Sequence, residues 1–276
     1  MIRNTGDSHN LRTALIIIAL TAALLAAAFL AFLPSGAGAS ELDRKTKAAV
    51  IDSLRFHLDK TYVFPDVADR MGKALSKNLK KGKYDGIEDI GGFTRRLTAD
   101  MEELSHDRHL WIVPATEEEV RIARQDAPTE EDKEMRLMRE AFTNFGFEKV
   151  DRLENNIGYL KFNRFADAER AGDIAVAAMN FLANSYAIII DLRDNGGGNP
   201  SMIQLISSYF FEEPVHLNDF YIRETDTLRQ FWTQSHVQGP RLADKPLYIL
   251  TSNRTFSGAE EFTYNMKNLK RALIIG

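Results

Sequence analysis

A serine lies at a predicted junction between a strand and a helix. Residues 247–250 form a short apolar run typical of a buried strand, and residues 251–255 form a polar turn before an amphipathic helix. Ser257 therefore lies beside the first N–H groups of that helix, which have no intrahelical partner and carry the positive end of the helix dipole. A hydroxyl there can act as a nucleophile, because these N–H groups stabilise the oxyanion that forms on attack at a carbonyl. The alternative is an N-cap serine, which does no chemistry.

Three consecutive glycines are the second candidate element. Gly196, Gly197 and Gly198 follow residues 186–192, a continuous apolar run typical of the centre of a sheet that is buried on both faces. Without a Cβ, their backbone N–H groups can approach a ligand closely, as in a phosphate site or an oxyanion hole. The run ends in no Gly-Lys-Ser/Thr and contains no GxGxxG, which excludes a P-loop and a dinucleotide fingerprint. A plain tight turn is the alternative.

A nucleophilic serine needs a base, and histidine is the usual base at neutral pH. Of the six histidines, His106 and His109 flank the entry to a predicted strand at residues 110–113, where a junction between two lobes would place them beside a cleft. A lone histidine is more often structural than catalytic. The others lie in an export segment, in an early helix or in a stretch without a clear pattern: His9, His57, His216 and His236.

Composition narrows the class of protein. The chain has 276 residues, of which 44% are hydrophobic and 27% charged, so it is an ordinary globular sequence with room for one large or two smaller domains. The net charge of -4 and the scattered positive charges give no reason to expect a nucleic-acid partner. The absence of cysteine excludes disulfides, thiolate metal sites and a cysteine nucleophile.

The first 39 residues have the pattern of an export segment. Residues 14–33 are an unbroken apolar run, and Ala37-Gly38-Ala39 fits the small-x-small rule of signal peptidase, with cleavage before Ser40. The run is also long enough to span a bilayer. Residues 1–39 are therefore predicted to be a cleaved signal peptide or, alternatively, a retained membrane anchor. Either places the folded part in the periplasm, outside the cell or on the outer side of a membrane.

The elements that must position the candidate residues fall into three stretches. Residues 40–115 are predicted to be a small helical bundle, with helices over 41–61, 65–75 and 93–104. Residues 116–146 are strongly charged and are predicted to be a connector. From residue 147 to residue 276 strands and helices alternate, which predicts an α/β sheet with covering helices.

Several stretches of the chain resemble the C-terminal processing (tail-specific) serine peptidase family, in particular the branch with interphotoreceptor retinoid-binding-protein-like modules and tricorn core peptidases. The matching stretches are Tyr62-Val63-Phe64-Pro65, residues 82–85, Asp107-x-His109-Leu110, residues 188–198 (IIIDLRDNGGG) and residues 251–276 (TSNRTFSGAEEF…KRALIIG). They run through most of the chain after residue 50. No PDZ-like insertion lies between the helical part and the core.

The resemblance implies a ClpP/crotonase-like α/β core preceded by a small N-terminal helical bundle, acting on a polypeptide substrate without a metal or an organic cofactor. It implies that Ser257 is the nucleophile and His109 the general base. It implies one oxyanion donor at Gly258 and another in the glycine turn, at Gly197 alone or together with Gly198. Five polar residues are expected to support the two turns rather than to react: Asp191, Arg193, Asp194, Asn253 and Glu260. Contact with the substrate is the alternative for all of them except Asp191.

The sequence departs from the family at its end. In the family, a Glu-x-Thr-like segment and a glycine-rich strand follow the position of Gly276, and the catalytic lysine of one branch and the acidic partner of histidine in the other lie there. A truncated chain is therefore expected, with its third catalytic residue beyond Gly276. One consequence would be that the 276-residue piece is inactive or poorly folded.

Two other functions stay open. One is a non-catalytic module that binds apolar ligands on the same fold. The other is an acyl-CoA enzyme of crotonase type. The pair Ser257 and His109 favours the peptidase over the binding module, and the export segment disfavours the acyl-CoA enzyme because acyl-CoA is intracellular.

Overall fold

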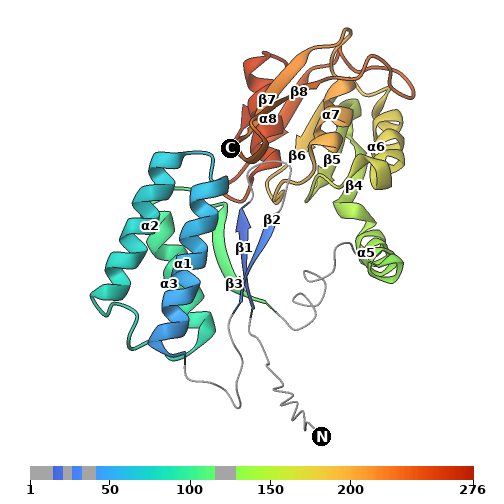
Figure 1. Cartoon of the computed structure of the whole chain (residues 1–276). Coiled ribbons are helices and arrows are strands. Elements are labelled where there is room, and N and C mark those ends of the chain that lie inside the picture. The colour runs from blue at the N-terminus through green and yellow to red at the C-terminus, as the bar shows by residue number, and fades with distance from the viewer. Residues whose placement is uncertain (1–14, 21–26, 33–41, 116–128) are drawn as a thin grey trace, which may run out of the picture. The chain divides into compact units, whose positions relative to one another are not determined.

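The computed structural model describes residues 15–20, 27–32, 42–115 and 129–276 (Figure 1). The chain divides into two compact units. One comprises Met1–Pro128 with Arg223–Thr225, and the other comprises Thr129–Ile222 with Asp226–Gly276. Each has its own cluster of buried apolar side chains. We call them the helical unit and the sheet unit.

Three helices form the helical unit, as the sequence predicts: α1 (Arg44–Thr61), α2 (Pro65–Lys80) and α3 (Ile90–Ser105). Each begins where the chain has a helix-start signal. Asp43 and Asp89 cap α1 and α3 by accepting a backbone N–H, and Pro65 opens α2 at a position where its missing N–H costs nothing. The helices share a core whose members recur at helical spacing: Val50, Leu54, Leu58, Met71, Leu75, Phe93, Leu97 and Met101.

A short sheet completes this unit. Its order is β2 (Ala27–Phe32), β1 (Leu15–Leu20) and β3 (Leu110–Pro114), all antiparallel. The apolar run predicted to be an export segment thus contains two strands in this structure. The cleavage site before Ser40 lies outside the described residues. No helix in the described part of the chain is both long and apolar enough to cross a bilayer. Export through residues 1–39 stays a prediction.

The sheet unit is built on five strands, listed in spatial order: β10 (Leu273–Ile275), β9 (Leu247–Leu250), β6 (Ala187–Asp191), β5 (Ile157–Phe162) and β4 (Phe147–Leu153). All neighbouring strands are parallel except β4, which pairs antiparallel with β5. The strand β6 lies at the centre of the sheet, and within the strand only Ile189 is half-buried rather than buried. Tyr186, the first residue of the predicted apolar run, is exposed. The predicted α/β class with a preceding helical region is therefore confirmed.

Three helices connect the parallel strands: α6 (Ala168–Leu182), α7 (Pro200–Ser208) and α8 (Gly258–Asn268). The remaining elements are α5 (Glu130–Phe142), the hairpin β7 (His216–Ile222) and β8 (Thr227–Trp232), and the 3-10 turns η1 (Asn144–Gly146), η2 (Glu154–Asn156) and η3 (Arg223–Thr225). Of the predicted connector, residues 116–128 lie outside the described residues, and α5 belongs to the sheet unit. The boundaries of the connector stay a prediction.

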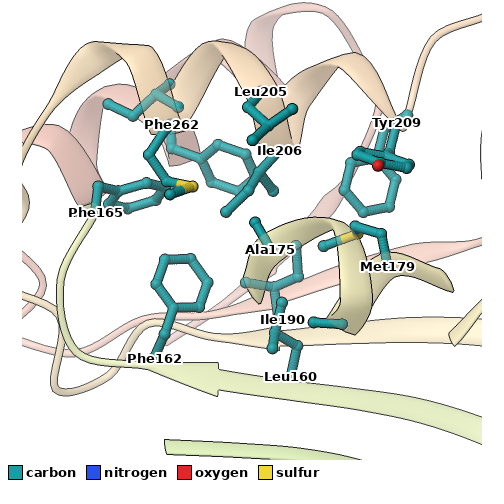
Figure 2. Close-up of a cluster of buried hydrophobic side chains, with 14 of the residues drawn as sticks. Leu160, Phe162, Phe165, Ala175, Met179, Ile190, Leu205, Ile206, Tyr209 and Phe262 are labelled. Carbon is teal, nitrogen blue, oxygen red and sulfur yellow. The ribbon is translucent and has the colours of Figure 1, made fainter. Parts of the chain in front are cut away.

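One buried cluster attaches these helices to the sheet. Figure 2 shows side chains of β5, β6, α6, α7 and α8 meeting in it. Phe165 contacts Phe162 edge-on, with 4.8 Å between ring centroids, and lies 5.5 Å from the ring of Phe262 on α8. Burying a side chain of this size stabilises the fold by about 1.5–3 kcal/mol. The cluster therefore fixes α7 and α8, the two helices that begin immediately after the glycine turn and Ser257.

Candidate active site

Ser257 has a backbone conformation that L-residues rarely adopt. Its φ is +53° and its ψ is -120°, at the point where the turn after β9 enters α8. Such a conformation costs on the order of 1–3 kcal/mol and persists only where the surroundings enforce it. The Ser257 N–H donates to Glu260 Oε2 at 2.7 Å. A sharp, strained strand-to-helix turn of this kind is one way in which hydrolases expose a serine nucleophile.

The turn at Ser257 lies beside the glycine turn because β6 and β9 are parallel neighbours. Asp191 and Leu250, the last residues of these strands, are paired in register. Both loops therefore leave the sheet at the same edge, formed by the carboxyl ends of the strands, where ligands bind in open α/β sheets.

Three hydrogen bonds to backbone carbonyls connect the two turns. They run from Phe256 N–H to the Asn195 carbonyl at 3.0 Å, from Thr255 Oγ1 to the Leu192 carbonyl at 2.8 Å, and from Ser252 Oγ to the Arg193 carbonyl at 2.5 Å. The Thr255 hydroxyl also accepts the Ser252 N–H at 2.9 Å. Because their partners lie about sixty positions apart in the chain, these bonds exist only when the sheet is formed. They hold Ser257 in its strained conformation.

Charged side chains support the same turns, as expected. Arg254 donates to Asp194 through Nε at 2.9 Å, and Lys161 lies 3.1 Å from the other carboxylate oxygen of Asp194. These hydrogen bonds, that of Arg254 foremost, hold the pKa of Asp194 below its usual value. Arg254 is exposed, and Asp194 and Lys161 are partly exposed, so these ion pairs orient the loops more than they stabilise the fold.

Asp191 is the buried anchor at the end of β6. Its carboxylate accepts hydrogen bonds from the Tyr159 hydroxyl at 2.6 Å and from the Arg193 guanidinium at 2.6 and 2.9 Å. Burial raises the pKa of Asp191, but the hydrogen bonds from Arg193 and Tyr159 outweigh burial and bring it to about 2. Asp191 is therefore ionised at neutral pH and already fully engaged, which fits the predicted supporting role.

The glycines lie against the serine. Gly197 has φ +95° and Gly198 has φ +144°, values that favour glycine. A Cβ on Gly197 would lie 2.6 Å from the N atom of Gly258 and 2.8 Å from the Cβ of Ser257. A Cβ on Gly258 would lie 3.0 Å from the N atom of Gly198. The structure thus brings together the four residues that the sequence singled out in this unit.

Their N–H groups are not equivalent. The Gly197 N–H donates to Asn195 Oδ1 at 2.8 Å, and the buried Asn195 is itself held by a bond from Nδ2 to the Phe162 carbonyl at 2.9 Å. Among the described residues, no acceptor is found for the N–H of Gly198 or of Gly258. In this geometry the free donors are Gly198 and Gly258. Gly197, which was expected to be the main donor of the glycine turn, is already engaged.

His109 lies in the helical unit, just before β3. Its Nδ1 is 2.9 Å from Asp107 Oδ1, and its backbone N–H donates to the same oxygen at 2.9 Å. The other carboxylate oxygen of Asp107 accepts the Tyr62 hydroxyl at 3.1 Å. Burial raises the pKa of Asp107, but the hydrogen bonds from His109 and Tyr62 outweigh it, so the pKa lies below its usual value. Since the two units are described separately, the pairing of His109 with Ser257 stays a prediction.

Sequence reasoning assigned no role to two residues of these sites. Asp107 belongs to the Asp-x-His pattern. An aspartate commonly accepts the backbone N–H of the residue two positions after it, so this spacing could have indicated that Asp107 contacts His109. Asn195 gave no signal, because its side chain is oriented by a carbonyl 33 positions away. In the described residues, no group of three or more carboxylates and histidines is arranged to hold a metal ion.

Comparison with known proteins gives two family matches. Residues 156–276 match the domain described as Peptidase family S41, and residues 41–147 match the N-terminal domain of Peptidase_S41 in eukaryotic IRBP.

Three similar solved structures have low identity. The photosystem II D1 C-terminal processing protease is 21% identical over 43% of this chain and 29% of its own, with a TM-score of 0.36. A candidate peptidase from Parabacteroides merdae is 16% identical over 85% of this chain and 75% of its own, with a TM-score of 0.49. A lipoprotein from Streptococcus agalactiae is 15% identical over 88% and 78%, with a TM-score of 0.45.

This chain thus covers less than a third of the processing protease. The two family matches, in contrast, leave only residues 148–155 unmatched between residue 41 and residue 276, and they show that the chain belongs to peptidase family S41.

Proposed function

We propose that this protein is a serine-type peptidase in which Ser257 is the nucleophile. The observation that carries the proposal is the strained backbone of Ser257, next to two N–H groups without an acceptor in the described residues. A serine that served only as a helix cap would not need this strain. Membership of a peptidase family supplies the substrate class, a polypeptide.

In the proposed reaction, Ser257 Oγ attacks the carbonyl carbon of the peptide bond while His109 takes the hydroxyl proton. The oxygen of the former carbonyl becomes an oxyanion and accepts the N–H groups of Gly198 and Gly258. Collapse of the intermediate breaks the C–N bond, His109 gives its proton to the leaving amine, and an ester to Ser257 remains. Water, activated by His109, then hydrolyses the ester. The mechanism requires the two units to meet at Ser257.

Turnover of fluorogenic peptides by the full natural chain tests this proposal. Ser257→Ala should lower kcat by on the order of 10⁴-fold or more, because the covalent step is lost. Ser235→Ala is a matched control, since Ser235 is an exposed serine of the same unit. Wild-type turnover by Ser257→Ala would refute the assignment.

A second candidate function has an observation of its own. A cavity of about 360 Å³ lies in the sheet unit and is lined mainly by apolar side chains: Phe147, Val150, Leu160, Ile174, Ala178 and Phe181. It fits the alternative of a module that binds apolar ligands. Saturable binding of a fluorescent fatty acid that Ala178→Trp abolishes, together with no peptide turnover by the wild type, would favour this alternative.

We also propose that the protein is exported through residues 1–39. The apolar run at residues 14–33 and the Ala37-Gly38-Ala39 sequence support this. Sequencing the N-terminus of the natural protein tests it: Ser40 at the N-terminus indicates a cleaved signal peptide, and an intact residue 1 in a membrane fraction indicates an anchor. An intact residue 1 in the soluble cytoplasmic fraction would contradict export.

A further inference from the structure

Three groups of the helical unit surround the carboxylate of Asp107. It lies 2.9 Å from His109 Nδ1, and it accepts the backbone N–H of His109 at 2.9 Å and the hydroxyl of Tyr62 at 3.1 Å. The carboxylate and the imidazole are each only about a quarter exposed. Three hydrogen bonds to one partly buried carboxylate stabilise its ionised form, in which it only accepts.

The contact fixes which nitrogen of His109 carries the proton. A neutral imidazole has one N–H and one lone pair. Because the ionised Asp107 can only accept, the proton of the neutral ring lies on Nδ1, where the carboxylate is. The lone pair therefore lies on Nε2, which is the nitrogen that can remove a proton from a serine hydroxyl.

The surrounding backbone holds Asp107 in place. His106 ends α3 in the left-handed conformation, with φ +53°, and the Ser105 hydroxyl accepts the Asp107 N–H at 3.1 Å. Tyr62 comes from the end of α1 and is 4% exposed. Burial, with the nearby Asp107 carboxylate, raises the pKa of Tyr62, so the phenol keeps its proton and remains a donor. Residues from the ends of α1 and α3 and from the start of β3 thus converge on one carboxylate.

A second histidine–aspartate contact gives a comparison. His216 Nε2 lies 2.6 Å from Asp219 Oδ1 in the β7–β8 hairpin. That carboxylate contacts the other ring nitrogen, and both side chains are more than a third exposed. A carboxylate at Nε2 favours the Nε2–H tautomer of a neutral ring, so this contact has the opposite consequence for proton transfer.

From this geometry we infer that Asp107 is the positioning residue for the base His109 and that Tyr62 positions Asp107 in turn. The inference rests on the proposed function for its place in catalysis. It gives His109 an acidic partner two residues before it in the chain.

The tautomer of His109 tests the inference without any turnover. In ¹⁵N NMR spectra of the full natural chain at a pH where the ring is neutral, His109 should carry its proton on Nδ1, and in Asp107→Asn the Nε2–H form should become the major one. A wild-type ring with its proton on Nε2 overturns the inference, and so does an unchanged tautomer in Asp107→Asn. Because Ser257 takes no part in this measurement, it remains decisive even if the peptidase proposal fails.

Kinetics test the catalytic part. Asp107→Asn should lower kcat by on the order of 10⁴-fold, as when a triad carboxylate is replaced by its amide, with KM within about twofold. Tyr62→Phe keeps the ring and removes one donor, so it should lower kcat by on the order of 10-fold and keep the Nδ1–H tautomer. Asp219→Asn, the matched control, should leave both kcat and KM at their wild-type values. If folded Asp107→Asn keeps kcat within 10-fold of the wild type, Asp107 is only a loop support and the inference is wrong.

Discussion

The turn that carries Ser257 and the turn that carries His109 are built by different means. Ser257 is strained, and bonds to residues about sixty positions away hold it. His109 is held by a carboxylate two residues before it and by one buried tyrosine. The first geometry exists only when β6 and β9 pair, whereas the second is local apart from Tyr62. The backbone geometry of the serine therefore depends on long-range assembly, and the orientation of the histidine depends mainly on local chemistry.

Gly197→Val should break the Ser257 turn with the largest effect. The new side chain would begin 2.6 Å from the N atom of Gly258, at φ +95°. We expect the free energy of unfolding of the sheet unit to fall by about 3 kcal/mol or more, because both overpacking and backbone strain are imposed, and peptide turnover to be lost. Urea unfolding and turnover measure this.

Gly196→Ala is the matched control for Gly197→Val. A Cβ on Gly196 would meet no atom within 4 Å, so both quantities should stay close to wild type. Equal stability and turnover in the two variants would show that the contact between the glycine turn and Ser257 does not exist. The Nδ1–H signal of His109 should be unchanged in folded Gly197→Val, because its partners are in the other unit.

Thr255→Val should have an intermediate effect. The shape is kept, but the bonds from Oγ1 to the Leu192 carbonyl and from the Ser252 N–H to Oγ1 are lost. The buried Leu192 carbonyl keeps only the Asn195 N–H as a donor, and the Ser252 N–H loses its acceptor. We expect a loss of about 1–3 kcal/mol in unfolding free energy. We also expect a fall in kcat, because the strained conformation of Ser257 is held less firmly. Thr263→Val, which removes only a bond to the helical carbonyl of Ala259, should stay within about 0.5 kcal/mol. A kcat of Thr255→Val at the wild-type level would contradict the dependence on long-range bonds.

Acid should have the smallest effect and should act through Asp191 in the sheet unit. The pKa of this carboxyl in the folded state, about 2, lies below its ordinary value, so the unfolded chain binds more protons in acid. Its contribution to stability is therefore complete above about pH 4 and is lost as the pH falls toward 2. The difference in unfolding free energy between wild type and Asp191→Asn should shrink over that range. Asp173→Asn, at an exposed carboxylate, is the control, and a difference that does not change with pH would contradict the account.

The parts of the fold with strong local patterns were predictable. The β-branched run at residues 186–192 predicts a central strand, and the apolar run at residues 247–250 predicts a buried one. The glycines and Ser257 that follow them predict the two turns. The three helices of the helical unit follow from their apolar spacing. In contrast, β8 exposes all but one of its side chains and has no alternation, so residues 225–239 gave no strand signal.

The finer features of the site depend on side-chain directions that a sequence does not contain. The bond between Gly197 N–H and Asn195 depends on where the Phe162 carbonyl lies, and it engages the N–H that the sequence was expected to supply as a donor. One of the hydrogen bonds that hold the Asp107 carboxylate comes from Tyr62, which lies 45 positions away in the chain. The relation between Ser257 and His109 crosses the two units and stays a prediction.

Labelling with a fluorophosphonate probe tests the central claim most directly, because the probe reacts with activated serines. The full natural chain should form one adduct, which mass spectrometry places on Ser257. Ser257→Ala should form none. His109→Ala should react at least on the order of 10³-fold more slowly, because the base is gone. A folded protein that stays unlabelled, or that is labelled at another serine, would contradict the account.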